Sequence, residues 1–551
     1  MSEFLAQLVR TATDDPQHGW IEAKEPNGHF ARLTWSQIHQ RALRVAGGLR
    51  ASGVRPGDAV ALFVGAPADV AVAAQGCWLA GASVTMLHQP TARTDLASYA
   101  ADTVGVLRMV GARALVLGAP YAALAAEFQE ALGDAVPVRS VDELGAAEPI
   151  DADPDVSDES AIALLQLTSG STSHPKAVRI SHANLISNMR AMVDAAQIVP
   201  DDVMVSWLPT FHDMGMVGFL TVPMTFGIKL VKMTPADLLA SPTSWMRAIS
   251  DYRGTITASP NFAYALATRA LRKATDLDLS SLRIALNGAE PVDPKATAGF
   301  VAEGERFGLD PGSVLCAYGM AEATLAVSFA PLGAGLEVDT IDQATLSRTG
   351  RAVPASEGTT SSFAMLGRPL DGLTVQVRSE GNVVGERQAG EIFVRGTAVT
   401  DGYLTVDGYV AAQDDEGWLA TGDEGYLVDD QIVVCGRTKD LIILAGRNIY
   451  PTDIERVAES VDGVRAGNSA AVALLAPGRE SFAVAVESTY ADDPQQSERI
   501  RQEVARVVNH ALEARPGQVV VVPPGWLPKT PSGKIQRSRV RERLESGDAP
   551  A

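Results

Sequence analysis

A stretch rich in Gly, Ser and Thr, LTSGSTSHPK, carries the side chains best suited to hold phosphate oxygens. Small residues let backbone N–H groups approach a ligand closely. The hydroxyls of Ser169, Ser171 and Thr172 and the ammonium of Lys176 add further donors. The composition alone also fits a linker, but an apolar strand-like run precedes the stretch and a helical pattern, SHANLISNMRAMV, follows it. We therefore predict a phosphate-binding loop, which is not a Walker A loop because GxxxxGK[ST] does not occur.

Two further segments place reactive side chains beside apolar runs. LPTFHDMGMVG holds His212 and Asp213, and AYGMAEAT holds Tyr318 and Glu322. The G-x-S-x-G motif that would carry the nucleophile of a Ser-His-Asp hydrolase does not occur in this sequence. The H-E-x-x-H motif of a metalloprotease does not occur either. Taken alone, the histidine fits a structural role, and Glu322 fits the first turn of a helix. These segments gain meaning only as members of a larger set.

Composition limits the classes of protein. The chain has 551 residues, 46% of them hydrophobic, and a net charge of −20, which predicts a globular protein without general affinity for nucleic acid. Three distant cysteines argue against disulfides or a metal scaffold and favour a cytoplasmic location. The N-terminus lacks a secretory pattern. The Ala- and Gly-rich window Val70 to Leu87 predicts a buried helix and a strand rather than a membrane span.

The elements that must position these residues follow an α/β pattern. Short apolar runs such as DAVALFVGAP, VMVSWLP, LRIALNGAE and SVLCAYG alternate with helical stretches, which predicts parallel-rich sheets covered by helices. Ligands in such sheets lie outside the carboxyl ends of the strands. From about Leu370 short strands and tight turns predict a small β-rich subdomain. After Arg437 the pattern predicts a compact α+β unit.

The order of the motifs indicates a family. The phosphate loop, HDMG, AYGMAE, GEIFVRG, TGD, GRTKD, GRNIYP and PSGKIQR occur in one order between about Thr34 and Arg543. This set resembles the adenylate-forming superfamily of acyl-CoA synthetases, luciferases and peptide-synthetase adenylation domains. The resemblance implies a large N-terminal domain, residues 1–436, and a small mobile C-terminal domain, residues 437–551. Residues 339–366 resemble the insertion of the fatty acyl-AMP ligases, although an ordinary surface loop is the alternative.

The resemblance implies a reaction. A fatty acid and ATP would give acyl-AMP and pyrophosphate, and the acyl group would pass to the thiol of an acyl carrier protein. Because no carrier domain follows Arg543 in this sequence, we expect the carrier to act in trans. The subgroup insertion is expected to hamper the rearrangement that lets coenzyme A react. The alternatives are an acyl-CoA ligase that releases acyl-CoA and a non-catalytic homologue.

The resemblance also assigns roles to residues. Lys534, His212 and Glu322 are the expected catalytic residues, and Glu322 would bind Mg²⁺. The expected nucleotide-binding residues are Thr168, Ser169, Gly170, Ser171, Thr172, Lys176, Gly288, Ala289, Glu290, Tyr318, Gly319, Met320, Asp423 and Arg437. The expected acyl-binding residues are His212, Asp213, Met214, Gly215 and Phe262. Lys439 would be the hinge.

Some residues depart from the family pattern or remain outside it. Ala177 stands where Gly usually follows Pro-Lys, and Leu404 replaces a common aromatic residue. Ala445 stands before GRN where a basic or other residue is usual. Arginines near the end of the chain could dock a carrier with an acidic face, although a solvated helix face is the alternative. These arginines are Arg499, Arg501, Arg506, Arg537, Arg539, Arg541 and Arg543.

Overall fold

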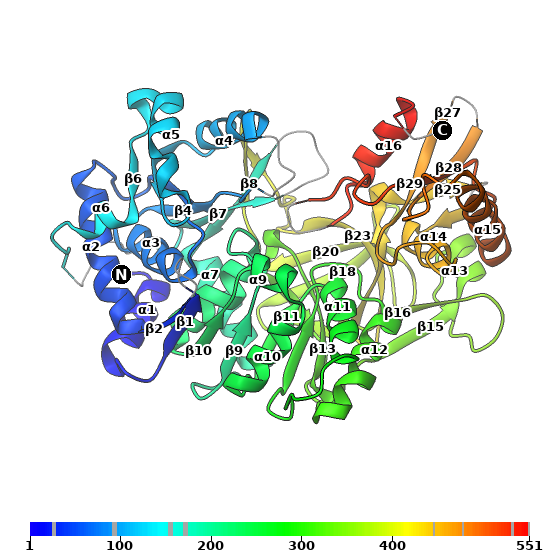
Figure 1. Ribbon diagram of the computed structural model, residues 1–551, viewed down its shortest axis with the longest axis horizontal. Helices are drawn as coiled ribbons and strands as arrows, with labels where there is room; N and C mark the ends of the chain where they lie inside the picture. Colours follow the sequence, from blue (N-terminus) through cyan, green and yellow to red (C-terminus); the bar gives the residue numbers. More distant parts are fainter. Residues whose placement is uncertain are drawn as a thin grey trace.

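The structure is a computed structural model. It describes residues 1–24, 29–90, 96–151, 158–168, 175–444, 447–476, 479–530 and 534–548. The predicted fold class is confirmed, since parallel-rich sheets are covered by helices (Figure 1). No helix in the described ranges is both long and apolar enough to cross a membrane.

An eight-stranded sheet has the order β22-β21-β8-β7-β4-β3-β5-β6. Its strands are β3 (Ala59–Phe63), β4 (Ser83–Met86), β5 (Ala112–Leu117), β6 (Val138–Ser140), β7 (Ile162–Thr168), β8 (Lys176–Ser181), β21 (Gly402–Thr405) and β22 (Gly408–Ala411). The apolar run DAVALF forms the central strand β3, which is buried along its whole length, as expected for a parallel strand covered on both faces.

The other elements in this part of the chain follow the predicted pattern with one exception, which is a strand. Helix α3 (Pro67–Leu79) and strand β4 confirm the buried helix and strand predicted for residues 70–87. The other helices in this part are α1 (Glu3–Asp14), α2 (Trp35–Ala51), α4 (Leu96–Met109), α5 (Ala125–Leu132) and α6 (Val141–Gly145). The exception is β8, which pairs antiparallel with β7 and separates the Ser-rich loop from helix α7 (His182–Ala195). The sequence predicted the helix directly after the loop.

A nine-stranded sheet has the order β17-β14-β13-β12-β11-β9-β10-β1-β2. Its strands are β1 (Trp20–Lys24), β2 (Phe30–Thr34), β9 (Val203–Ser206), β10 (Lys229–Lys232), β11 (Ile256–Ser259), β12 (Ile284–Asn287), β13 (Val314–Gly319), β14 (Ala326–Phe329) and β17 (Arg368–Pro369). The strands from β10 to β13 are parallel, so their carboxyl ends share one edge.

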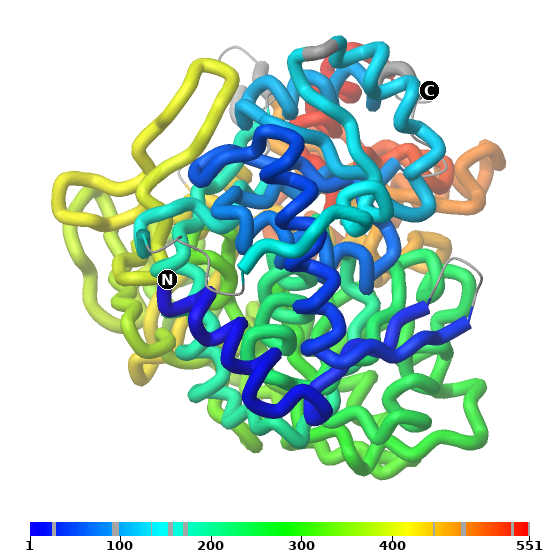
Figure 2. The backbone as a smooth tube through the Cα atoms, turned by 90° about the vertical axis from the view of Figure 1, so that its left-hand side faces the viewer, coloured from blue at the N-terminus to red at the C-terminus, as the bar shows by residue number. Residues whose placement is uncertain are grey.

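Helices cover this sheet, and α1 packs against α2, α7 and α8 on the outside of the molecule (Figure 2). Helix α10 lies on one face, where the indole N–H of Trp245 donates to the hydroxyl of Thr257 in β11. The remaining helices are the π-helix Met214–Thr221, α8 (Val222–Phe226), α9 (Pro235–Ala240), α10 (Thr243–Tyr252), α11 (Asn261–Leu271) and α12 (Pro294–Gly304).

The β-rich part is a five-stranded antiparallel sheet in the order β19-β18-β20-β23-β24. Its strands are β18 (Leu373–Ser379), β19 (Asn382–Val383), β20 (Gly390–Gly396), β23 (Leu419–Val428) and β24 (Gln431–Arg437). The predicted insertion, residues 339–366, forms the hairpin of β15 (Val338–Asp342) and β16 (Thr360–Ala364) with α13 (Gln343–Thr349).

The last part of the chain has hydrophobic clusters of its own. Its elements are β25 (Ile442–Leu444), β26 (Arg447–Ile449), α14 (Pro451–Ala458), β27 (Ser469–Ala476), β28 (Arg479–Glu487), α15 (Pro494–Leu512), β29 (Gln518–Val522) and α16 (Arg537–Glu545). Two buried clusters are made only of residues after Asp440. In Figure 1 these elements, coloured orange to red, lie together beside β15, β16 and α13.

Candidate active site

One cavity of about 1620 Å³ lies at the carboxyl ends of β7, β11, β12 and β13 and extends toward the C-terminal elements. It joins predicted residues that are far apart in the sequence. Those that line it are Thr168, Lys176, His212, Asp213, Met214, Phe262, Gly288, Ala289, Glu290, Tyr318, Gly319, Met320, Glu322, Asp423, Arg437, Lys439 and Lys534. Gly215 is not part of the lining. Ser169, Gly170, Ser171 and Thr172 lie outside the described residues.

Lys176 and Glu322 form the first polar pair in the cavity. The Lys176 ammonium lies 3.3 Å from a carboxylate oxygen of Glu322. The Tyr403 hydroxyl donates to the same oxygen at 3.1 Å, and the Tyr403 ring lies 3.8 Å from the ammonium. A cation over an aromatic face is attracted by the ring. Tyr403 therefore holds both members of the pair at one position.

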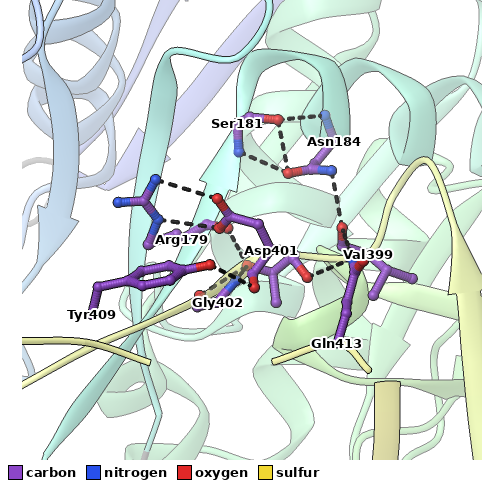
Figure 3. Close-up of polar contacts among 9 residues, drawn as sticks. Arg179, Ser181, Asn184, Val399, Asp401, Gly402, Tyr409 and Gln413 are labelled. Atoms are coloured by element: carbon purple, nitrogen blue, oxygen red, sulfur yellow. Dashed lines mark hydrogen bonds and ion pairs between the residues drawn. The ribbon is translucent and has the colours of Figure 1, made fainter. Parts of the chain in front are cut away.

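A network of polar contacts fixes the segment that carries Tyr403 (Figure 3). The Arg179 guanidinium donates to both carboxylate oxygens of Asp401, at 3.1 and 3.3 Å. The amide groups of Asn184 and Gln413 donate to the carbonyl oxygen of Val399. Strand β21 then pairs with β8, with Tyr403 opposite Val178. The position of Tyr403 thus depends on contacts between segments more than 200 residues apart.

Asp423 is the centre of a second polar group. It is nearly buried and accepts a 2.7 Å hydrogen bond from the Tyr318 hydroxyl. Its other oxygen lies 3.0 Å from Nε of Arg437, the residue opposite it in the β23–β24 ladder. The Asp423 carboxylate raises the pKa of Arg437, and burial raises the pKa of Tyr318 well above its ordinary value. A carboxylate has about four lone-pair sites, so Asp423 can accept further hydroxyl groups.

His212 and Asp213 follow the carboxyl end of β9. The two side chains lie 2.6 Å apart, and the Asp213 carboxylate also accepts from the backbone N–H of Met214. Burial alone would raise the pKa of Asp213, but the His212 side chain, the charge of Lys534 and that N–H together lower it. The Lys534 charge also opposes the rise that burial causes in the pKa of Glu290. Lys534 therefore acts electrostatically at the carboxyl edge of the sheet.

The backbone is conformationally restricted at two positions of the cavity lining. A Cβ atom on Gly319 would lie 2.1 Å from the carbonyl oxygen of Leu325, so only glycine fits there. Ala289 has a φ of +69°, a conformation that non-glycine residues rarely adopt and that concentrates at functional sites. Gly215 packs on backbone in the same way, since its Cβ would lie 2.0 Å from the carbonyl oxygen of Pro209, but it is not part of the cavity lining. Its predicted contact with the acyl group stays a prediction.

The predicted hinge lies in a short 3₁₀ turn, Thr438–Asp440, between β24 and β25. Burial lowers the pKa of Lys439, and the charge of Arg437 adds to this effect. Asp440 and Glu455 both bind the guanidinium of Arg537. Arg537 is thus engaged inside the protein and not free to meet a partner.

The insertion contacts the C-terminal elements directly. Asp453 of α14 is buried and accepts hydrogen bonds from Ser361 at 3.0 Å and from Gln343 at 3.2 Å. The Ser347 hydroxyl donates to the carbonyl oxygen of Asn448. Burial raises the pKa of Asp453, although Arg456 opposes this. The insertion is therefore more than a surface loop, because side chains of α13 and β16 bind it to the last part of the chain.

Tyr403 and His88 are among the cavity residues that were not found from the sequence. Tyr403 gave no local signal, because its partners lie far away in the chain. His88 follows β4, and the rule that sites lie at carboxyl ends of parallel strands could have found it. Burial and the nearby His212 lower the pKa of His88 to about 4, so it is neutral at neutral pH.

Comparison with known proteins places the chain in a family. The family model described as AMP-binding enzyme matches residues 9–404. The chain belongs to the AMP-binding enzyme family. This AMP-binding enzyme is 50% identical over 548 residues to "Putative ligase Rv1013" of Mycobacterium tuberculosis, covering 98% of this chain and 99% of the relative.

Two further similarities are informative. The enzyme is 35% identical over 412 residues to the medium-chain-fatty-acid–[acyl-carrier-protein] ligase JamA of Moorena producens, covering 72% of this chain and 69% of the relative. It also resembles a structure from studies of fatty acyl-adenylate ligases from E. coli and L. pneumophila. That match has a TM-score of 0.89 and 29% identity and covers 100% of this chain and 98% of the other.

Proposed function

We propose that this enzyme joins a fatty acid to AMP, with ATP as the donor and pyrophosphate as the second product. The observation that supports this most is that one cavity combines two environments. Its polar end holds Lys176, Glu322, Asp423 and Lys534. Its other end is apolar and suits an alkyl chain. The similarity to a fatty acyl-adenylate ligase agrees with this assignment.

The reaction needs charge neutralisation rather than a base. A fatty carboxylate is already ionised near neutral pH. One carboxylate oxygen attacks the α-phosphorus, a new O–P bond forms, and the bond from that phosphorus to the bridging oxygen breaks, releasing pyrophosphate. In this scheme Lys534 offsets the negative charge of the carboxylate and the α-phosphate as they meet. His212, beside Asp213, orients the carboxylate.

The nucleotide would lie along the carboxyl edge of the sheet. The Asp423 carboxylate has capacity to accept from the two ribose hydroxyls, bonds of the strong charge-assisted kind. Arg437 would reach the ribose or α-phosphate, while Tyr318 and the backbone of residues 288–290 would flank the adenine. Thr168 and Lys176 would hold the β- and γ-phosphates, and residues 169–172 would belong to the same loop.

Magnesium would enter with the nucleotide. Among the described residues, no group of three or more His, Cys, Asp or Glu side chains forms a metal site. Mg²⁺ is commonly bound by one or two carboxylates together with substrate phosphates and waters, and Glu322 beside the phosphate-binding Lys176 fits that pattern. When bound, the ion would screen the negative charge of the phosphates. Glu322 would then exchange its contact with Lys176 for the metal.

We further propose that the acyl group passes to the thiol of an acyl carrier protein in trans. In this scheme residues 1–436 and 437–551 act as two domains, and the second swings about Lys439. The similarity to JamA supports a carrier as the acceptor. The contacts of Ser361, Gln343 and Ser347 with the C-terminal elements would restrict the movement that coenzyme A requires.

The assay that tests this combines a fatty acid and ATP with coenzyme A, with phosphopantetheinylated carrier protein, or with neither. We expect acyl-AMP and pyrophosphate in all three, acyl-carrier product with the carrier, and little acyl-CoA. Abundant acyl-CoA would instead identify an acyl-CoA ligase. Deleting residues 347–361 should increase acyl-CoA formation. If acyl-CoA formation does not increase, the insertion is not what restricts the reaction with coenzyme A.

A further inference from the structure

The apolar branch of the cavity lies between one face of the nine-stranded sheet and helix α7. Neighbouring strands expose every second residue to it. In the strand register Ile256 lies opposite both Met204 and Ile284, and Leu286 lies opposite both Ala258 and Leu315. Residues opposite one another share a face of the sheet. The wall made by the sheet therefore consists of Met204, Ile256, Ala258, Ile284, Leu286, Leu315 and Ala317.

The opposite wall comes from helical segments. Met192 and Ala196 of α7, with Gly218, Phe219 and Val222 of the next helical stretch, line the branch from that side. Gly218 contributes no side chain to this wall, and a Cβ atom there would lie 3.1 Å from the end of the Leu325 side chain, closer than an ordinary contact. The residues named for both walls carry no polar side chain.

An ion pair lies at the amino ends of the strands, just beyond the lining residues Met204, Ile256 and Ile284. Arg283, just before β12, donates to the carbonyl oxygens of Ala196 and Gln197 at 3.1 and 3.0 Å. It also binds the carboxylate of Asp202, which is 3% exposed and precedes β9. The Thr255 hydroxyl donates to the same carboxylate. The end of α7 is thus fixed to three strands directly below Met204, Ile256 and Ile284.

We propose that this floor limits the acyl substrate to a medium chain of about ten to twelve carbons. The branch runs along β12 from Gly288, at the carboxyl end, to Ile284 at the floor. Four residue steps in a strand span about 13 Å. An extended alkyl chain with single bonds of about 1.5 Å advances about 1.3 Å per carbon. The inference rests on the proposed function, since it places the carboxylate beside His212.

The floor resists extension because its polar groups are already paired. A longer chain would have to separate Arg283 from Asp202 and leave a buried carboxylate without its partner, which is unfavourable. The side chains of Ile256 and Ile284 therefore set the depth of the branch. Ala258 lies two residues after Ile256 in β11 and so nearer to the proposed position of the carboxylate. Its side chain sets the width of the branch at half its depth.

The test uses full-length enzyme, ATP and saturated fatty acids from about six to eighteen carbons, with pyrophosphate release and acyl-AMP as readouts. For the wild type we expect kcat/KM to be greatest near ten to twelve carbons and at least about tenfold lower at sixteen. Ile256→Ala should move the optimum about two carbons longer, and Ala258→Val should move it shorter. Ile249→Ala is the matched control, since Ile249 is equally buried but belongs to α10 on the other face of the sheet.

The outcomes separate the two proposals. Failure to form adenylate with any fatty acid would overturn the proposed function itself. Equal efficiency at about ten and eighteen carbons, or an optimum that neither variant moves, would overturn the length limit and leave the function standing. If Ile256→Ala fails to fold, as circular dichroism would show, Ala258→Val decides, because it removes no buried volume. A shift in Ile249→Ala equal to that in Ile256→Ala would also contradict the proposal.

Discussion

The two ends of the cavity are built in different ways. The polar end collects side chains from β8, β13, β23 and the segment after Thr530, so its geometry depends on how separate parts of the chain meet. The apolar end is one face of four adjacent strands with α7 and the next helical stretch opposite, and Arg283 lies just beyond it. A movement between parts can therefore rearrange the chemical groups and leave the acyl pocket intact. Substitutions should divide in the same way, into those that change the rate and those that change stability.

The largest expected effect is at Lys534. Replacing Lys534 by Ala should lower the rate of adenylate formation about 10²–10³-fold, the usual loss when one transition-state donor is removed. The melting temperature should stay the same, because Lys534 is partly exposed and outside the hydrophobic clusters. Pyrophosphate release at saturating substrate measures the first effect, and Lys273→Ala, an exposed lysine on the other part, is the control. A nearly unchanged rate would contradict the assignment.

At the floor of the apolar end we expect a substitution to lower stability rather than the catalytic rate. Arg283→Ala should lower the free energy of unfolding by about 2–3 kcal/mol, because it leaves the buried Asp202 unpaired while Arg283 itself is about one third exposed. Urea unfolding measures this. Burial alone would raise the pKa of Asp202, but hydrogen bonds led by Arg283 lower it. The wild type should therefore lose this stabilisation as the pH falls through the lowered pKa. An equal acid response in Arg283→Ala would contradict the role of the pair.

A smaller effect on the catalytic rate is expected at Tyr403, within the polar end. Tyr403→Phe removes the hydroxyl that donates to Glu322 but keeps the ring beside Lys176. One such hydrogen bond is worth about 1 kcal/mol, so we expect a several-fold lower kcat and nearly unchanged stability. Tyr409→Phe on the neighbouring strand is the control, since its hydroxyl bonds the backbone of Asp401 and not Glu322. An equal loss of kcat in both variants would assign the effect to the β21–β22 hairpin as a whole and not to the hydrogen bond with Glu322.

The smallest effect is expected where the insertion meets the C-terminal elements. Because burial raises the pKa of Asp453, its contribution to stability is present below the ordinary pKa and is lost as the pH rises through the raised value. Asp453→Asn keeps an oxygen for Ser361 and Gln343 and removes the buried charge. We expect it to stabilise the protein by about 0.5–1 kcal/mol at neutral pH and not in acid. Thermal unfolding at both pH values, with Ser361→Ala as control, measures this, and equal effects at both pH values would contradict it.

Local patterns in the sequence predicted much of this arrangement. Apolar runs located the buried strands, and the carboxyl-end rule with the ordered motifs located the residues that line the cavity. What local patterns missed depends on pairing across long distances. Strand β8 follows the Ser-rich loop because β7 and β21 pair with it on its two sides. The position of Tyr403 beside Glu322 has the same cause.

Two departures from the family pattern have a joint explanation in that pairing. Ala177 of β8 lies directly opposite Leu404 of β21. Ala177 is larger than the usual glycine, and Leu404 is smaller than the usual aromatic residue, so the two changes compensate each other in volume. Each was visible in the sequence as a separate departure. Their relation was not visible, because more than 220 residues separate them.

The pairing of β8 with β21 also affects how the chain folds. On the ribosome, β8 exists long before β21 has been synthesised, and until then the side of β8 away from β7 is an unpaired sheet edge. Such an edge is a template for pairing with other chains, and closing so long a loop is intrinsically slow. The nascent enzyme is therefore open to aggregation at this edge until Leu404 emerges, and a chain truncated before residue 400 would keep the edge permanently.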